Sequence, residues 1–156
     1  MRNAYILFAE LLVLSVLCCG CENIQKTPKD VAEGLTQCTD IYDVFFQKNP
    51  KCTPILATEG DVNDDGDADL VLLYVGVDCN NWMCVLLRDK DGGYTASKTH
   101  KAPVSNQSVI FRNIDGKPPL EFIVQGMKGA KSGFAIYRME NGELMDVFGE
   151  GMEDCC

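Results

Sequence analysis

A chain of 156 residues is long enough for one domain with a hydrophobic core. It carries 14 Lys and Arg against 23 Asp and Glu, and its formal charge of −9 excludes charge-driven binding to nucleic acid or to an anionic membrane surface. Nine cysteines are more than a cytosolic chain commonly keeps without a metal or redox use, so this count favours an oxidising compartment.

Residues 1–20 have the pattern of an export signal. Arg2 supplies a positive charge, residues 5–17 are mostly apolar, and small residues and cysteines follow. The apolar run is too short to span a bilayer comfortably, which is typical of a secretory signal peptide. The sequence therefore predicts that residues 1–20 are a signal peptide and not part of the folded domain.

The segment 18–21, Cys-Cys-Gly-Cys, resembles the lipobox of bacterial lipoproteins, in which a cysteine after small residues receives the lipid and begins the mature chain. Cys21 is the expected lipid site because Gly20 precedes it and polar sequence follows, and Cys19 is the competing site. The resemblance implies a lipidated tether over 21–27 and a lipoprotein anchored in a membrane of the cell envelope, facing the periplasm. Simple secretion and a retained anchor are the alternatives.

Six cysteines are left if residues 1–20 are removed and Cys21 carries lipid, an even number suited to three disulfides. They are Cys38, Cys52, Cys79, Cys84, Cys155 and Cys156. The spacing of Cys79 and Cys84 favours a bridge across a hairpin over the closer spacing of a redox pair. Adjacent cysteines rarely form a bridge with each other, so Cys155 and Cys156 are expected to pair with Cys38 and Cys52. A bridge between Cys38 and Cys52 is the alternative.

A helix is predicted over 28–48. Thr27 is a suitable N-cap and Pro28 a suitable first residue. Asn49-Pro50 ends the helix. Between these signals an apolar stripe recurs at steps of four and three residues, at Val31, Leu35, Cys38, Tyr42 and Phe45. We expect the stripe to pack on a β-sheet, with a membrane-surface or partner-binding helix as the alternative.

The acidic loop that follows Gly60 is the most informative motif of the chain. Oxygen-bearing side chains fall at alternate positions, with Gly66 in the middle. Such a loop wraps a hard cation like Ca²⁺, because oxygen ligands stand at positions 1, 3, 5 and 9, a backbone carbonyl at 7 and glycine at 6. Without a cation the carboxylates would repel one another. The expected calcium ligands are Asp61, Asn63, Asp65, Asp67 and Asp69. A solvated acidic turn is the alternative, and Leu72 at position 12 disfavours an EF-hand.

From Pro54 onward the pattern changes to about eight short strands separated by polar or glycine turns. A glycine- and lysine-rich loop is expected over 126–132. The fold class is therefore mainly β (α+β), with one N-terminal helix packed on antiparallel strands in a single domain, 28–156. The strands form two four-stranded, blade-like units, 54–99 and 104–149, which do not close a propeller.

The two units share a weak internal repeat: residues 60–72 can be aligned with residues 112–124, an offset of about 50 residues. The string 61–71 resembles the calcium-binding FG-GAP/VCBS-type repeat of integrin-like β-propellers and many secreted bacterial proteins. The resemblance implies Ca²⁺ held by the side chains at positions 1, 3, 5 and 9 and by the carbonyl of Asp67. In the second unit Phe111 stands in place of the first Asp and Glu121 is displaced by two residues, so we expect no ion there, or a weakly bound one.

The sequence indicates binding and not catalysis. His100, the single histidine, lies in a predicted loop where a solvated side chain is expected, and Trp82 is expected to pack on a disulfide. The first hypothesis is a non-catalytic interaction module with a protein or glycan partner and structural Ca²⁺. The second is an inhibitor or accessory subunit of an envelope enzyme, acting through an exposed loop such as 126–132. Neither hypothesis includes a nucleic-acid partner.

Overall fold

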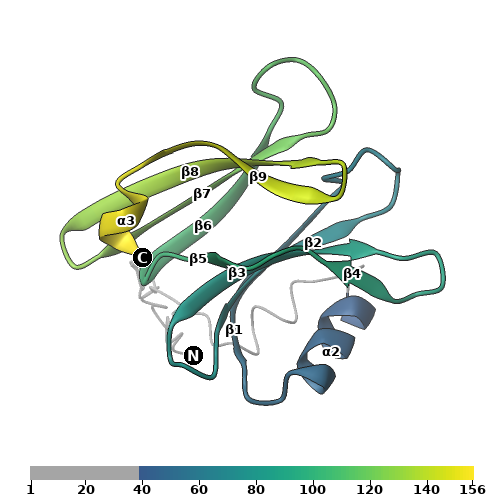
Figure 1. Cartoon of the computed structure of the whole chain (residues 1–156), viewed down its shortest axis with the longest axis horizontal. Coiled ribbons are helices and arrows are strands. Elements are labelled where there is room, and N and C mark those ends of the chain that lie inside the picture. Colours follow the sequence, from purple (N-terminus) through teal and green to yellow (C-terminus); the bar gives the residue numbers. More distant parts are fainter. Residues whose placement is uncertain (1–38) are drawn as a thin grey trace, which may run out of the picture.

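The computed structural model of the protein describes residues 39–156. The expected signal peptide, the lipid site Cys21, the tether, Cys38 and helical residues 28–38 lie outside the described residues. Within residues 39–156 nine strands form two antiparallel sheets (Figure 1), and the predicted fold class is confirmed: mainly β, with two separate units that do not close a propeller.

The first sheet carries the acidic loop between its first two strands. It consists of β1 (Thr53–Gly60), β2 (Asp69–Val75), β3 (Asn81–Arg88), β4 (Tyr94–Ala96) and β5 (His100–Lys101). The strands pair in the order β1-β2-β3-β4, and β5 also pairs with β3. The strands β1 to β4 are therefore consecutive antiparallel neighbours, joined by turns at the ends of the strands, and β5 extends β4 along the same side of β3.

The second sheet repeats this meander. It consists of β6 (Ser105–Arg112), β7 (Glu121–Lys128), β8 (Lys131–Glu140) and β9 (Glu143–Glu150), paired in that order. Both β6 and β7 begin 52 residues after their counterparts β1 and β2. The predicted internal repeat is thus present in the structure as two sheets with the same strand order.

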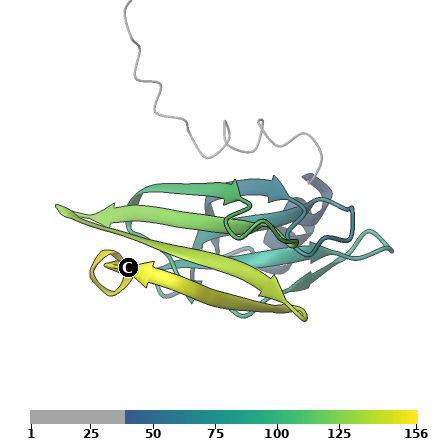
Figure 2. The same ribbon diagram turned by 90° about the horizontal axis from the view of Figure 1, so that it is seen from above.

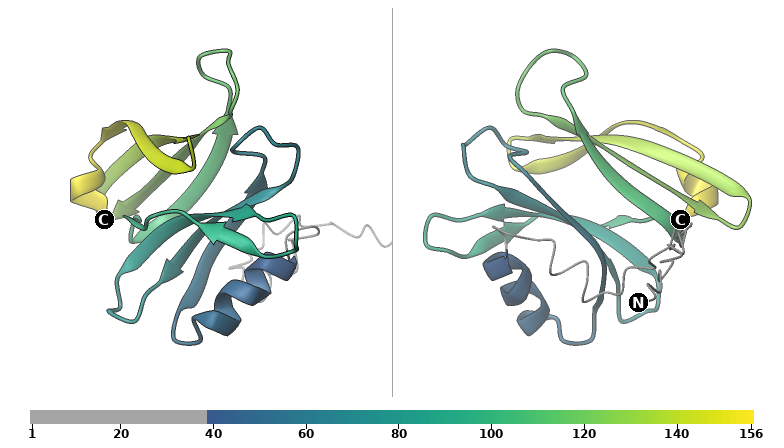
Figure 3. Two further views of the ribbon diagram at one scale, coloured as in Figure 1. Left: turned by 45° about the vertical axis from the view of Figure 1, so that its right-hand side comes forward. Right: turned by 180° about the vertical axis from the view of Figure 1, so that it is seen from behind.

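The two sheets pack face to face, and the helix α2 (Thr39–Lys48) covers the far side of the first sheet (Figure 3). Seen from above, the second sheet lies in front of the first (Figure 2). The main core lies between the sheets and joins Val71 and Leu73 of β2 to Phe122 and Val124 of β7. The intervening residues of β2 belong to a second core under the helix, so this strand is buried on both faces, which explains its unbroken apolar run.

The described part of the predicted helix ends where the sequence indicated. α2 stops at Lys48, just before Asn49-Pro50. Its buried side chains Ile41, Tyr42 and Phe45 pack on the first sheet, as expected for a helix over a sheet. The rings of Phe45 and Tyr74 lie with their centroids 5.2 Å apart. No helix within residues 39–156 is long and apolar enough to cross a membrane.

The predicted loop over 126–132 is wrong. β7 continues to Lys128 and β8 begins at Lys131, so only Gly129 and Ala130 form the turn. Gly126, which began the predicted loop, is paired with Gly133 inside the hairpin. Both glycines are required by close packing: a Cβ on Gly126 would lie 2.3 Å from the Cβ of Pro103. The exposed segment that an inhibitory loop would use is therefore only a tight turn.

Candidate metal site

The acidic loop, residues 61–68, joins β1 to β2 at one edge of the first sheet. Gly60 pairs with Asp69 at the base of the loop, so the antiparallel ladder holds its two ends together. Asp64 has φ 62° and Gly66 has φ 88°, and these two left-handed residues turn the chain back on itself. The loop is thereby closed into a short ring of polar side chains.

Three of the predicted ligands come together around one backbone amide. The Asp65 N–H donates to Oδ1 of Asp61 at 3.2 Å and to Oδ1 of Asn63 at 3.1 Å. Asp61 also accepts from the Gly66 N–H, at 3.0 Å. Asn63 Nδ2 donates in turn to Asp65 Oδ2 at 2.8 Å. The side chains of Asp61, Asn63 and Asp65 thus converge inside the loop.

The fourth predicted side-chain ligand, Asp69, is buried at the start of β2. Its Oδ2 accepts from the Val62 N–H at 3.1 Å and its Oδ1 from the Arg88 N–H at 2.9 Å. Burial is the main cause that raises the pKa of Asp69, the two amides lower it, and the charges of Asp65 and Asp61 raise it, so that the pKa is about 6. Asp69 is therefore close enough to the loop for the negative charge of Asp61 and Asp65 to affect its pKa.

Asp67 stands apart from this arrangement. Its side chain is exposed, and its N–H donates to Oδ1 of Asp65 at 2.9 Å. Within residues 39–156 no three acidic, cysteine or histidine side chains lie together as a group that could hold a metal ion. The oxygen atoms of the predicted ligands are hard donors, which is the kind of donor that Ca²⁺ prefers. The loop carboxylates that accept hydrogen bonds from backbone amides would have to turn toward the ion.

The second repeat shows the same loop with different chemistry. The Ile114 N–H donates to Oε2 of Glu121 at 2.8 Å, seven residues apart, as the Val62 N–H does to Asp69. Arg112 pairs with Glu121 just as Gly60 pairs with Asp69. The alignment of residues 60–72 with 112–124 therefore holds, and the predicted assignment of the ligand positions in the second loop is corrected. Glu121 is not displaced, and Asn113, not Phe111, occupies the place of the first Asp.

Arg138 supplies the second loop with a cation from the protein itself. Its guanidinium forms ion pairs with the buried Glu121 and, at 2.7 Å, with Asp115. The ion pair with Arg138 lowers the pKa of Asp115. Sequence reasoning missed this arginine, because only the pairing of β7 with β8 places it beside Glu121. The loop expected to bind an ion weakly or not at all is thus neutralised from within.

The cysteines do not form the predicted bridges among the described residues. Cys52, Cys79, Cys84, Cys155 and Cys156 are all free. The predicted Cys79–Cys84 bridge fails because Cys84 lies within β3, buried under α2, whereas Cys79 is exposed in the preceding turn with φ 60°. Burial raises the pKa of Cys84 to about 12. The sulfurs of Cys155 and Cys156 are 3.4 Å apart.

Two aromatic residues differ from expectation. His100 belongs to the short strand β5, not to a loop, and its ring packs edge-on against Tyr137 with the centroids 5.4 Å apart. Trp82 contacts no disulfide, since Cys79 and Cys84 are free. Its Nε1 instead donates to Oδ1 of Asp78 at 3.0 Å, and Lys101 Nζ lies 4.1 Å from the ring centroid.

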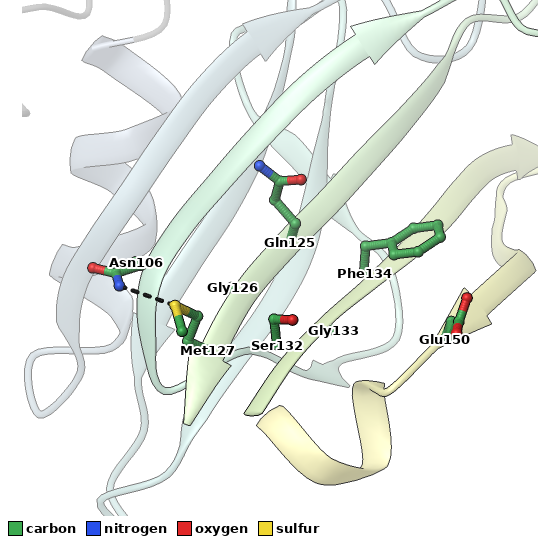
Figure 4. Close-up of a pocket in the computed structure, with 8 residues that line it drawn as sticks. All are labelled: Asn106, Gln125, Gly126, Met127, Ser132, Gly133, Phe134 and Glu150. Carbon is green, nitrogen blue, oxygen red and sulfur yellow. Dashed lines mark hydrogen bonds between the residues drawn. The ribbon is translucent and has the colours of Figure 1, made fainter. Parts of the chain in front are cut away.

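A cavity of about 550 Å³ opens over the second sheet (Figure 4). Gln125 of β7 and Phe134 of β8 line it, and the Asn106 amide bonds to the sulfur of Met127 at one end. Glu150 is the one titratable residue in its wall.

No family model, curated protein or solved structure matches this chain. Function must therefore be argued from the residues themselves.

Proposed function

We propose that this protein is an exported lipoprotein, anchored through Cys21, which acts as a non-catalytic interaction module and uses Ca²⁺ to stabilise its fold. We further propose that it contains one full and one degenerate copy of an FG-GAP/VCBS-type repeat. The equal spacing of the two loops and the matching bonds to Asp69 and Glu121 support this reading.

The observation that carries the calcium proposal is the convergence of Asp61, Asn63 and Asp65 on the Asp65 amide, beside the buried Asp69. A bound Ca²⁺ would neutralise these carboxylates and favour the ionised form of Asp69. The second loop supports the proposal by contrast, because there Arg138 neutralises the acidic side chains. Both loops thus bring a positive charge to the same place in the repeat.

The interaction surface proposed is the outer face of the second sheet. One apolar row crosses all four strands, because Ile110 pairs with Ile123, Ile123 with Ile136, and Ile136 with Phe148. Phe148 is 53% exposed and Ile110 38% exposed. The corresponding outer face of the first sheet is covered by α2. An uncovered apolar row of this kind is typical of a protein-binding surface.

Isothermal titration of the full-length protein with Ca²⁺ tests the calcium proposal. We expect one site that is filled per chain, and a lower melting temperature when EDTA removes the ion. An unchanged melting curve in EDTA would show that the ion is not structural.

The surface is tested by quantitative affinity capture from solubilised cell envelopes with the wild-type protein and the variant Phe148→Asp. We expect Phe148→Asp to abolish capture of the partner, because a charge in the middle of an apolar contact is not compensated. The matched control is Val77→Asp, which changes an exposed valine in the turn after β2. Equal capture by all three proteins would contradict the proposed surface.

A further inference from the structure

Three sulfur atoms converge at the C-terminal helix α3 (Met152–Cys155). The Sγ atoms of Cys155 and Cys156 are 3.4 Å apart, and Cys155 Sγ lies 3.7 Å from Sδ of Met152. Cys155 is fully buried and Cys156 partly buried. The acidic loop does not include these residues, and the proposed interaction module does not require them.

The fold holds this cluster firmly in place. The chain turns at Gly151, which has φ 67°, and packs its backbone directly on β8. A Cβ on Gly133 would lie 2.4 Å from the Gly151 carbonyl oxygen, so only glycine permits this approach. The Val104 N–H also donates to the Cys155 carbonyl, at 3.0 Å. The cluster is therefore attached to both the second sheet and the segment that precedes it.

The spacing of the sulfurs matches a metal chelate. With metal–sulfur bonds of about 2.3 Å, sulfurs separated by 3.4 Å subtend an angle of about 95° at a shared ion. The pair separated by 3.7 Å subtends about 107° under the same assumption. The second angle is close to the tetrahedral value and the first is narrower but within the range of a chelate, whereas a disulfide would need the two Sγ atoms at about 2.05 Å.

The surroundings provide an entry path. Met152, Cys156 and His100 line one cavity of about 290 Å³ beside the cluster. The imidazole of His100 is held edge-on against Tyr137, which also lines this cavity. Two thiols and a thioether are soft donors, and thioethers distinguish Cu(I) from Zn²⁺ and from hard cations.

We propose that Cys155, Cys156 and Met152 bind one Cu(I) ion. The two thiol protons leave to solvent as two sulfur–copper bonds form, while the thioether binds as a neutral donor. Copper remains monovalent throughout, so the step consumes no oxidant or reductant. The site binds a soft monovalent metal and is chemically unrelated to the oxygen donors of the acidic loop.

The experiment supplies Cu(I) to the reduced full-length protein in competition with a chromogenic Cu(I) chelator. Copper retained per chain is measured, together with the sulfur coordination seen by X-ray absorption. We expect Cys156→Ser to lose one equivalent of copper relative to wild type. Comparing variants separates this site from the cysteines near the N-terminus. Cys79→Ser, which changes an exposed cysteine in the β2–β3 turn, is the matched control and should retain the full amount.

Met152→Leu keeps the proposal testable if a cysteine variant fails to fold, because leucine preserves the apolar volume. We expect this variant to retain native circular dichroism and to bind Cu(I) at least about tenfold more weakly. Loss of a ligand should weaken binding at least as much as loss of a residue that only supports a ligand. Unchanged copper retention in both Cys156→Ser and Met152→Leu would overturn the site. A disulfide between Cys155 and Cys156 that persists in the reduced protein, detected as a mass lower by about 2 Da, would also overturn it.

Discussion

Asp69 shows how a single carboxylate can link the fold to an ion. It is buried at the start of β2, and its two oxygens accept one hydrogen bond each, from the backbone N–H groups of Val62 and Arg88. Burial still opposes its charge, and the neighbouring Asp65 and Asp61 add to the effect, so its pKa rises to about 6. The residue thus joins the loop to the edge of β3 while retaining a charge that a cation would stabilise.

The raised pKa of Asp69 predicts the pH dependence of stability in the absence of calcium. An unfolded Asp has a pKa of about 3.9, so the folded state binds this proton more tightly. The stabilisation is complete below about pH 4 and is lost as the pH rises through about 6. In EDTA, urea unfolding should show that the wild type loses stability relative to Asp69→Asn between pH 4 and pH 7. A stability difference that does not change with pH would contradict the raised pKa.

Asp65 is expected to be the loop residue most sensitive to loss of charge, because its side chain lies inside the converged group. Asp65→Asn should weaken Ca²⁺ binding about tenfold, which corresponds to about 1.4 kcal/mol, and lower the melting temperature in Ca²⁺. Asp64→Asn makes the same change at an exposed neighbour whose left-handed backbone asparagine tolerates. Calorimetric titration of both variants decides the matter: equal affinities would mean that bulk charge, not ligation, attracts the ion.

At the scale of elements, both loops bring acidic side chains together, and they differ in how that negative charge is balanced. Each joins the first two strands of a sheet. Each ends in a buried acidic residue whose carboxylate accepts a hydrogen bond from the backbone N–H seven residues earlier. In the second unit β8 contributes Arg138, whose guanidinium pairs with Glu121 and Asp115. Strand pairing alone thus brings the positive charge to this loop.

Removing Arg138 should therefore be costly. Arg138→Met leaves Glu121 buried with no opposing charge from this side chain, and we expect a loss of about 3–5 kcal/mol in the free energy of unfolding. Pairing this change with Glu121→Gln should restore much of the loss, since the buried charge is then gone. The control is Lys98→Met, which breaks an exposed pair with Glu143 and should cost at most about 1 kcal/mol. Similar losses in urea unfolding for Arg138→Met and Lys98→Met would argue against a buried pair.

At the scale of the whole molecule, the second sheet has two unlike faces. The inner face joins the main core through side chains such as Phe122, which is fully buried. The outer face presents the apolar row that ends at Phe148. The first sheet differs because α2 covers its outer face. The repeat is therefore symmetric in its strands and asymmetric in its layers.

This asymmetry predicts opposite effects for two phenylalanines of the same sheet. Phe122→Ala should lower the free energy of unfolding by about 3–5 kcal/mol, because it leaves a cavity between the sheets. Phe148→Ala should change it by less than about 1 kcal/mol, since the side chain is 53% exposed. Chemical denaturation of both variants is the measurement, and a large loss for Phe148→Ala would show that this face is covered in the folded protein.

Much of the fold could be predicted from local signals. The end of α2 before Asn49-Pro50, the apolar run of β2 and the acidic turn at Gly66 all depend on neighbours in the chain. The hairpin around 126–132 was mispredicted because its glycines serve close packing in the interior of strands, and sequence alone does not separate that use from a loop. The predicted Cys79–Cys84 bridge likewise failed because strand pairing buries one sulfur and leaves the other in a turn.

The sequence by itself determined the class of fold, the division into two units and the cluster of oxygen-bearing side chains in the acidic loop, because propensity, periodicity and turn chemistry act over a few residues. Tertiary structure alone decided that Arg138 pairs with Glu121, that one sheet face carries a helix while no element within residues 39–156 covers its counterpart, and that His100 shares a cavity with Met152 and Cys156. These juxtapositions depend on strand register and on sheet packing, which bring together residues that are separated along the chain.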